Sequence, residues 1–398
     1  MSAVSLRRAA AAALAALPAV VACASGSTAV PAPAPAATTT LLTRLGVDTV
    51  AVEQFTRTPT HMEGTLVTRF PVTRMTRYAV DLGPNGAPTR ANLTLRDGMG
   101  APVPGGLQSL SVRYGRDSAV FVGHRSASDT TLAFAVRGPV QPSIPSSYGL
   151  WEIELARMSL LGRDSVEFAL VPLDLDAQDV TRQAVRVIGR DSVRIIANGG
   201  PFYVRHDGRG RIVAADGMRT GTKVLVARVD SLDLATLARG WAERELAGAF
   251  AGPASTRDTV EATLGPARVW IDYGRPALRG RNVWSNGVLG DTLWRTGANA
   301  ATQLRTNVDL VVGDATVPAG TYTLWTAATP GGYRLVINRQ PGNDYDASRD
   351  LVRVPLRESS VPTPVERFTI GVEPQSSGGA LLTLTWGTKR LSVPVAPK

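Results

Sequence analysis

Short runs of alternating apolar and polar residues, separated by turn signals, fill most of this 398-residue chain. Residues 65–70, 77–82 and 166–171 are examples. Alternation with a period of two gives a strand one buried and one solvated face. Turn sequences such as Asp207-Gly208 stand between the runs. The chain is therefore expected to be mainly β, with antiparallel strands joined by short turns.

The N-terminus has the layout of a secretory signal. Arg7 and Arg8 precede an apolar stretch, residues 9–21, that ends just before Cys23, the single cysteine. The end of this segment resembles the lipobox of bacterial lipoproteins, which predicts a lipoprotein signal peptide over 1–22 and lipidation of Cys23. An ordinary signal cleaved within Ala22-Cys23-Ala24 is the alternative.

A Pro-, Ala- and Thr-rich segment, 23–40, follows and lacks the large apolar residues that a core needs. We expect a disordered tether. Extended, its 17 or so residues would reach roughly 50 Å. Ala24 after the cysteine resembles the outer-membrane sorting pattern. The predicted location is the cell envelope, lipid-anchored in the outer membrane and facing the periplasm.

The chain is basic, with a formal charge of +10, and only three of its 43 basic residues are lysines. Arginine suits anionic partners, but a GC-rich genome also supplies arginine codons. The arginines are scattered, for example Arg186, Arg194 and Arg205, and form no run. No nucleic-acid-binding motif accompanies them, so nucleic acid is not an expected partner.

The first domain is expected over 41–250 as a curved antiparallel sheet, half-barrel-like, that faintly resembles periplasmic lipoprotein carriers. Three copies of Gly-Arg-Asp-Ser, beginning at Gly115, Gly162 and Gly189, are predicted hairpin turns. One amphipathic helix, about 232–247, places Leu234 and Trp241 on one stripe and closes the domain. A linker is expected over 251–266.

The second domain, 267–398, contains at least seven strand-like runs and should be a β-sandwich or jelly-roll. Its motifs are Y-x-R-P-x-x-x-G-R from Tyr273, W-R-x-G-A-N-x-A-T from Trp294, P-A-G-x-Y-x-L from Pro318 and W-x-x-x-x-x-x-V-P from Trp386. In this order they resemble the bacterial domain-of-unknown-function family numbered 2911 (DUF2911). That family has no settled activity, so the resemblance implies a fold and no mechanism.

Trp294, Arg295 and Asn299 form the candidate ligand-binding site, which Tyr273, Arg275 and Arg281 would complete. An indole face, a guanidinium fork and an amide suit a sugar ring or an anionic group. The alternative is a purely structural role, in which Trp294 fills the core and Asn299 hydrogen-bonds to backbone groups that have no other partner.

Catalytic and metal signatures are sparse. His61, His124 and His206 lack metal spacing, and the second domain has neither His nor Cys, which excludes Ser–His and Cys–His catalysis within it. Asp344, Asp346 and Asp350 could hold Ca²⁺, but the segment lacks the EF-hand glycine and terminal glutamate, so a solvated loop is the favoured interpretation. No cofactor and no metal site is predicted.

Two functions follow from the sequence. The first is a non-catalytic envelope lipoprotein that binds a glycan, a lipid, a peptide or an envelope protein. The alternative is an envelope carbohydrate-active hydrolase or lyase that uses Asp272, Tyr273 and Arg275. The alternative needs a pair of carboxylates at working distance.

Overall fold

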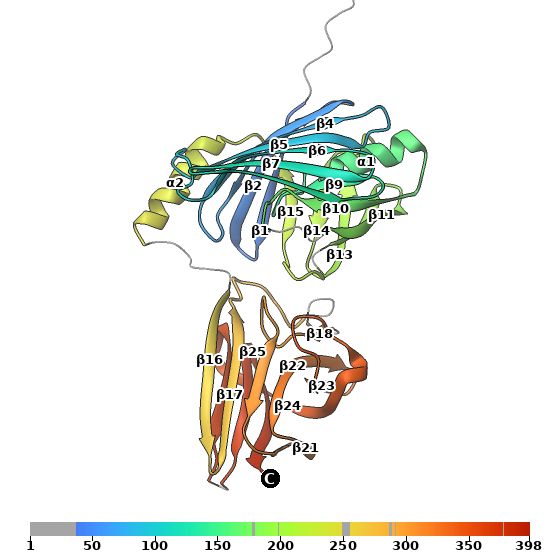
Figure 1. The fold of residues 1–398 in the computed structure, drawn as a ribbon. Coiled ribbons are helices and arrows are strands. Elements are labelled where there is room, and N and C mark those ends of the chain that lie inside the picture. The colour runs from blue at the N-terminus through green and yellow to red at the C-terminus, as the bar shows by residue number, and fades with distance from the viewer. Residues whose placement is uncertain are drawn as a thin grey trace, which may run out of the picture. The chain divides into compact units, whose positions relative to one another are not determined.

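The computed structural model describes residues 37–176, 180–197, 199–248, 255–285, 289–290, 292–376 and 378–398 (Figure 1). The predicted signal peptide, Cys23 and nearly all of the predicted tether lie outside the described residues. The described chain is mainly β, as expected, and its strands form two large sheets. The part of the chain built on the first sheet is called the first body, and the part built on the second sheet is called the sandwich.

The first sheet has 15 strands, and neighbouring strands are consecutive along the chain except where the first strand pairs with the last. The strands are β1 (Thr39–Leu45), β2 (Asp48–Arg57), β3 (His61–Thr68), β4 (Arg74–Leu82), β5 (Pro88–Asp97), β6 (Leu107–Tyr114), β7 (Ser118–Arg125), β8 (Asp129–Ala135), β9 (Val140–Ser143), β10 (Ser165–Pro172), β11 (Thr181–Gly189), β12 (Ser192–Ala197), β13 (Gly200–His206), β14 (Ile212–Asp216) and β15 (Leu225–Val229).

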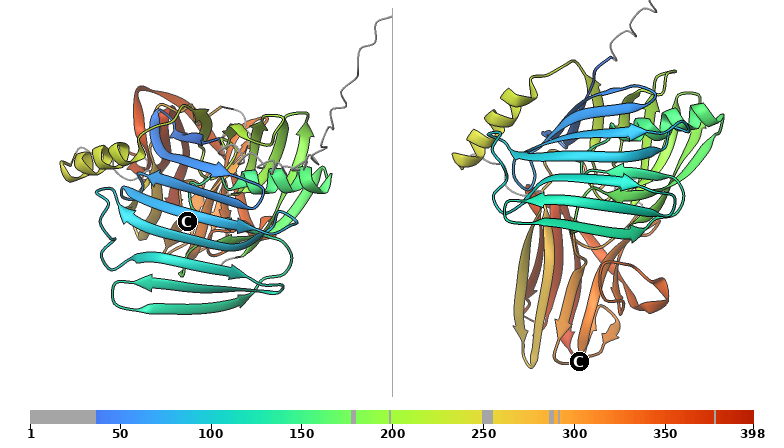
Figure 2. Two further views of the ribbon diagram at one scale, coloured as in Figure 1. Left: turned by 90° about the horizontal axis from the view of Figure 1, so that it is seen from above. Right: turned by 45° about the horizontal axis from the view of Figure 1, so that its top comes forward.

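The sheet order is β8-β7-β6-β5-β4-β3-β2-β1-β15-β14-β13-β12-β11-β10-β9. The pairs are antiparallel, except that β9 runs parallel to β10. The sheet curls so that apolar side chains from β2–β7 and from β10–β14 share one core (Figure 2). This is the curved antiparallel domain that the sequence predicts, in a sheet that stays open between β8 and β9.

Side chains of the chain itself fill the inner face of the curl. The aromatic rings of Tyr148, Trp151 and Phe202 lie 4.9–5.5 Å apart, centroid to centroid. Tyr148 and Trp151 come from the segment that enters helix α1 (Trp151–Leu161), and Phe202 comes from β13. Around these rings, the inner face is therefore a packed core.

Helix α1 is absent from our sequence prediction. It buries Trp151, Ile153, Leu155 and Met158 together with charged residues, so it shows no amphipathic stripe to read. Helix α2 (Leu234–Leu246) confirms the predicted helix over 232–247. Asp233 caps its first turn, and Leu234, Ala238 and Trp241 cover Val52 and Val67 on the outer face of β2 and β3.

Two of the three Gly-Arg-Asp-Ser repeats are hairpin turns. Those at Gly115 and Gly189 join β6 to β7 and β11 to β12. The prediction for the repeat at Gly162 is wrong, because this glycine ends helix α1 with φ of 60° and leads into β10. A left-handed residue after a helix is a common use of glycine, and it serves helix ends as well as turns.

The second sheet has ten strands. They are β16 (Ser255–Leu264), β17 (Ala267–Pro276), β18 (Leu293–Trp294), β19 (Thr302–Thr306), β20 (Leu310–Val312), β21 (Ala315–Val317), β22 (Gly320–Thr329), β23 (Gly332–Asn338), β24 (Asp350–Pro374) and β25 (Ala380–Pro397), with a short 3-10 helix, η1 (Ala347–Arg349), before β24.

The 25-residue strand β24 makes this sheet a sandwich. It pairs with β23 up to Leu356 and with β25 from Arg357 onward, so the sheet continues from one layer into the other. Between the layers, Ile271 and Leu304 face Leu382 and Val395. The predicted runs 351–354 and 368–370 are parts of one strand, as are 381–384 and 391–393.

Two predicted boundaries need correction. The expected linker 251–266 contains β16, whose ten residues pair with β17, so the sandwich begins at Ser255. The expected tether 23–40 ends in β1, where Thr39 and Thr40 are buried. Polar threonines show no alternation of apolar and polar residues, so the sequence does not reveal that the strand begins at Thr39.

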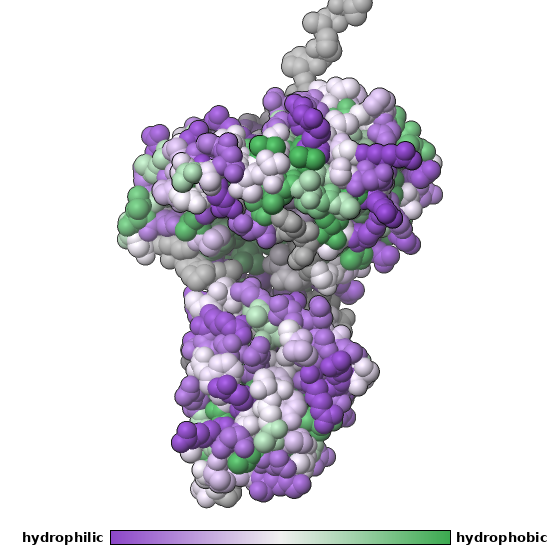
Figure 3. All heavy atoms as spheres, in the orientation of Figure 1, coloured by the Kyte–Doolittle hydropathy of each residue, from purple (hydrophilic) through white to green (hydrophobic). Residues whose placement is uncertain are grey.

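The surface is polar where the sandwich faces the viewer in Figure 3, with apolar residues separated from one another. No helix in the described ranges combines the length and the apolar composition that a membrane crossing requires.

Candidate functional site

Trp294 lies in an aromatic cluster at one end of the sandwich. Its ring stacks on Trp386 at 5.7 Å between centroids and meets Phe368 edge-on at 4.8 Å. Its indole N–H donates to the backbone oxygen of Gly297 at 2.7 Å. Trp284 adds a further edge contact to the cluster. These contacts give Trp294 the structural role that the sequence left open as the alternative.

Arg281, Trp294, Arg295 and Asn299 contribute to the lining of one hollow, so the structure does bring four of the six predicted site residues together. The side chains of Arg281, Trp294 and Arg295 already have hydrogen-bond partners. Arg295 donates to the backbone oxygen of Asn299 at 2.5 Å, and Arg281 donates to the backbone oxygens of Ala277 and Leu278. Burial, followed by repulsion from Arg279, lowers the pKa of Arg281 to about 10.

Tyr273 and Arg275 lie apart from that hollow. The Tyr273 ring is 1% exposed and packs edge-on against Phe368, 5.8 Å away, and burial raises its pKa. Arg275 holds two strands together, because it donates to the backbone oxygen of Phe368 and pairs with Asp258 at 2.9 Å. Both side chains therefore have structural roles: Tyr273 fills the sandwich core, and Arg275 links neighbouring strands.

Two of the three aspartates considered for Ca²⁺, Asp346 and Asp350, are engaged in internal contacts. Asp346 caps the η1 turn through the Ser348 N–H, and Asp350 accepts from Asn338, Tyr345 and Arg353. Within the described ranges, no three His, Cys, Asp or Glu side chains gather as a metal site.

The histidines have local partners. His61 contacts Asp81, His124 contacts Asp129, and His206 contacts the backbone oxygen of Asp207. Each contact joins residues of one hairpin or one turn. This is the surface or turn role that the sequence favours for all three.

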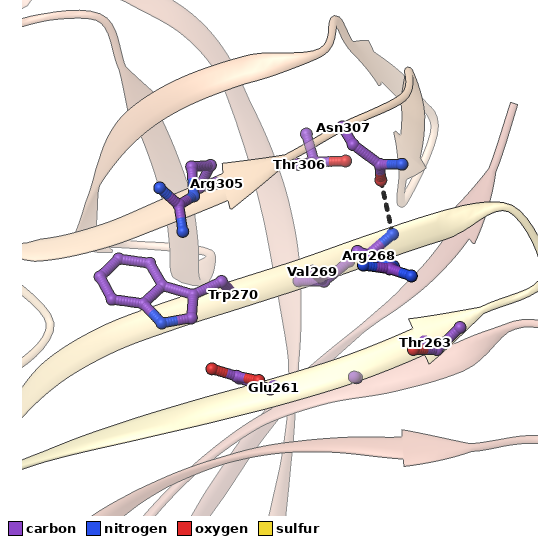
Figure 4. A pocket seen from close by; sticks show the side chains of 9 residues that line it. Glu261, Thr263, Arg268, Val269, Trp270, Arg305, Thr306 and Asn307 are labelled. Carbon is purple, nitrogen blue, oxygen red and sulfur yellow. Dashed lines mark hydrogen bonds between the residues drawn. The ribbon is translucent and has the colours of Figure 1, made fainter.

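A different surface of the sandwich presents free polar groups around an aromatic ring. On the outer face of the sheet, Glu261 of β16, Trp270 of β17 and Arg305 of β19 lie directly opposite one another across the strands. The Arg305 guanidinium carbon lies 5.0 Å from the centroid of the Trp270 ring. Figure 4 shows the indole between the Arg305 and Glu261 side chains.

These three residues line an open groove of about 580 Å³. Thr263, Arg268 and Asn307 lie at one end of it (Figure 4). Asn307 is occupied, since it accepts the Arg268 N–H at 2.6 Å and donates to the Pro266 oxygen. In the described part of the chain, the side-chain polar groups of Glu261, Arg268 and Arg305 make no hydrogen bond or ion pair. They are available to a ligand.

Sequence reasoning missed this groove, although β17 carries a signal for it. Val269 and Ile271 point into the core, so the alternation assigns Arg268, Trp270 and Asp272 to the solvent side. A tryptophan at a polar position of the alternation has its ring on the solvent side of the sheet, where the ring does not fill the core. The cross-strand partners Glu261 and Arg305 could not be read in this way, because they depend on register.

The first body holds a second set of polar groups, buried in its core. The Glu53 carboxylate accepts from the hydroxyls of Tyr78 and Ser147 at 2.7 and 2.5 Å and from two backbone N–H groups, those of Tyr148 and Gly149. Burial raises the pKa of Glu53 above its ordinary value of 4.5 despite these bonds.

Helix α1 contributes two further buried acids. Glu152 accepts from the Ile212 N–H at 2.8 Å and pairs with Arg57, while Glu154 pairs with Arg157 at 2.6 Å. Burial raises the pKa of Glu154 to about 7. Glu152 fastens α1 to the sheet, whereas the Glu154 pair lies within the helix. Both carboxylates are buried, so a substrate would not reach them without opening the core.

Comparison with known proteins gives one family and two solved structures. No curated protein matches the chain. A DUF1089 family protein from Pseudomonas aeruginosa is 14% identical over 42% of this chain and 90% of its own, with a TM-score of 0.31. A β-barrel-like DUF1849 protein from Brucella abortus is 11% identical over 49% of this chain and 96% of its own, with a TM-score of 0.30. Residues 255–395 match the family described as protein of unknown function (DUF2911), which confirms for the C-terminal third the family resemblance found in the sequence.

Proposed function

We propose that this chain is a non-catalytic lipoprotein of the cell envelope whose C-terminal sandwich binds acidic carbohydrate in the Trp270 groove. The row Glu261–Trp270–Arg305 is the observation that carries the proposal. It puts one aromatic face and unpaired charged groups on an exposed sheet.

The chemistry of the row fits a sugar. A pyranose presents an apolar face of C–H groups that packs on an indole, and its hydroxyls need donors and acceptors at the rim. Arg268 and Arg305 supply forked donors, and Glu261 supplies an acceptor. Two arginines against one carboxylate favour sugars that carry a carboxylate, sulfate or phosphate group.

The carboxylates of the sandwich favour binding over hydrolysis. A glycoside hydrolase needs two acids about 5–9 Å apart at the scissile bond. Glu261 is the single carboxylate among the described residues that line the groove. Asp272, which the sequence offered as a catalytic acid, pairs with Arg257 at 2.6 Å, and Glu366 accepts from the Arg279 N–H.

Affinity gel electrophoresis tests the binding of carbohydrate. The chain from Ala36 to Lys398 is one compact unit and includes both cores, so it is the protein to use. We expect polygalacturonate or dextran sulfate in the gel to retard it more than neutral dextran does. Replacing Trp270 by alanine should weaken retardation by about tenfold, since stacking on one aromatic ring contributes about 1–1.5 kcal/mol.

Gln303→Ala is the matched control, because Gln303 lies on the same outer face, opposite Asp272 and one row from Trp270. It should bind like the unaltered chain. Equal retardation of the Trp270→Ala variant, or no retardation of the unaltered chain by any acidic polymer or by a glycan array, would contradict the proposed ligand.

The envelope location is tested separately. It depends on Arg7, Arg8, the apolar segment and Cys23. Cells that express the full chain and are fed a labelled fatty acid should label it, whereas Cys23→Ser should abolish labelling. An unlabelled chain recovered from the cytosol would overturn the lipoprotein proposal and leave the groove experiment unaffected.

A further inference from the structure

Three arginines on consecutive strands lie side by side on the outer face of the first sheet. Arg186 of β11 is directly opposite Arg194 of β12, and Arg194 is directly opposite Tyr203 of β13. Arg205 follows on β13, two residues from Tyr203 and therefore on the same face. Opposite residues have Cβ atoms about 5 Å apart and diagonal ones about 7–8 Å, so the three guanidinium groups share one small area.

The register puts these arginines outside the core without ambiguity. Their strand neighbours Val185, Val193 and Val204 are fully buried in the curl. Because successive side chains of a strand alternate, Arg186, Arg194 and Arg205 point the other way, and all three are exposed.

None of the three arginines has a hydrogen bond or ion pair among the residues that the structure describes, where other surface arginines do. Like charges placed directly opposite on neighbouring strands destabilise a sheet. The acids nearest in register are Asp216, opposite Tyr203, and Glu167 of β10, and neither bonds to these arginines. The cluster is therefore a net positive area with unused donors.

Large apolar side chains lie among the charges. Tyr203 is 39% exposed and Ile196 is 47% exposed, and Ile188, at the end of β11, is 51% exposed. All three occupy outward positions of the same strands. Arginine together with exposed aromatic and aliphatic residues is the composition of a surface that meets a lipid headgroup region.

We propose that this face, Arg186, Arg194, Arg205, Tyr203, Ile196 and Ile188, docks on the surface of a membrane that contains anionic lipid. Charge complementarity to headgroup phosphates supplies the attraction, and the tyrosine and isoleucines enter the interface. Single-stranded nucleic acid would need several stacking rings in a groove, and this face offers one ring on open strands. The docking surface is distinct from the Trp270 groove and does not depend on carbohydrate binding.

Vesicle sedimentation of the Ala36–Lys398 chain tests the proposal, because that chain lacks Cys23 and hence any lipid anchor. It should sediment with mixed phosphatidylcholine–phosphatidylglycerol vesicles and stay in solution with pure phosphatidylcholine. Each arginine should contribute about fivefold to the partition coefficient, so Arg186→Gln/Arg194→Gln/Arg205→Gln should lose on the order of 100-fold. Added salt should weaken binding of the unaltered chain through screening.

The matched control removes the same charge elsewhere. Arg113, Arg239 and Arg357 are exposed and belong to β6, α2 and β24. Their triple glutamine variant should bind nearly as well as the unaltered chain. Tyr203→Ala should lower binding to anionic vesicles with the arginines intact. Thermal unfolding of the variants checks that each remains folded, which we expect because every changed side chain is exposed.

Three results would overturn the proposal. One is equal binding of the unaltered chain to neutral and anionic vesicles. Another is an equal loss in the two triple variants, which would show that net charge alone matters. The third is binding to heparin or to oligonucleotides through the three arginines while anionic vesicles are not bound, which would assign the face to a soluble polyanion.

Discussion

A β-carbon at Gly274 would lie 2.0 Å from the backbone oxygen of Ala298. Gly274 belongs to the first motif of the sandwich, and Ala298 belongs to the second, so the two motifs meet through their backbones. The loop after β18 lies directly on β17 at this point, and Trp294 closes it by donating to Gly297. The first two motifs of the family resemblance therefore pack directly against each other.

Gly274→Ala should destabilise the sandwich severely, by roughly 3 kcal/mol or more, because the added methyl meets backbone that cannot swing away. Urea unfolding followed by tryptophan fluorescence measures the change. Gly240→Ala in helix α2 is the control, since nothing lies within 4 Å of its added β-carbon. It should be neutral or stabilising by up to about 1 kcal/mol. Similar stabilities of the two variants would show that the 298 loop can move away from β17.

Period-two alternation was enough to predict the class of the fold and many of its strands. It could not predict α1, because that helix buries Glu152 and Glu154 beside Trp151, and burial on all sides removes the stripe that identifies a helix. The same alternation places Trp270 outside the core. It cannot say that Arg305 faces Trp270, because β17 and β19 are not consecutive strands. Nor can it say that Arg186 faces Arg194, because the register of the β11–β12 hairpin shifts next to its turn.

Trp294 illustrates the limit on predicting a site. Its neighbours Arg295 and Asn299 are close in sequence, which made them a candidate ligand set, and they are close in space as well. What the sequence could not show is that the Trp294 indole N–H and the Arg295 guanidinium donate to backbone oxygens of the loop itself. Arg186, Arg194 and Arg205 show the reverse: they form no run in the sequence, and the antiparallel pairing of β11, β12 and β13 brings them together.

The Glu53 bonds predict a graded response to mutation. Glu53→Ala leaves two hydroxyls and two backbone N–H groups without their acceptor in the core, and should cost roughly 3–5 kcal/mol of unfolding free energy. Glu53→Gln keeps one oxygen for the N–H groups of Tyr148 and Gly149 and should cost less. Tyr78→Phe removes one bond and should cost about 1 kcal/mol. Chemical denaturation ranks the three variants, and an alanine variant as stable as the glutamine variant would show that water replaces the carboxylate.

Alanine variants of Trp294 and Arg295 should show whether these residues stabilise the sandwich or bind the ligand. Trp294→Ala removes the ring that packs on Trp386 and Phe368 and should cost roughly 3 kcal/mol. Arg295→Ala removes one hydrogen bond to the backbone at a half-buried position and should cost about 1 kcal/mol. Thermal melting measures both changes. If Trp294→Ala leaves the melting temperature unchanged and abolishes retardation by acidic polymers, the hollow beside Trp294 is the ligand site in place of the Trp270 groove.

Glu154 predicts how stability changes with pH. Its pKa rises from 4.5 to about 7 on folding, mainly through burial, with Arg157 opposing the rise. The folded chain therefore holds the proton more tightly than the unfolded chain. The stabilisation is complete below about pH 4.5 and is lost as the pH rises through 7, a change of about 3 kcal/mol at most. Glutamine mimics the protonated acid, so Glu154→Gln should match the unaltered chain at pH 5 and exceed its stability at pH 8.

The measurement is the difference in unfolding free energy between Glu154→Gln and the unaltered chain, taken across this range, because the difference cancels the titration of all other groups. Glu243→Gln on the exposed face of α2 is the control, because it removes the same charge outside the core. A difference for Glu154→Gln that does not change between pH 5 and pH 8 would mean that the carboxylate stays ionised in the core over that range. Its Oε1, which makes no hydrogen bond in the described part of the chain, would then require water inside the sheet.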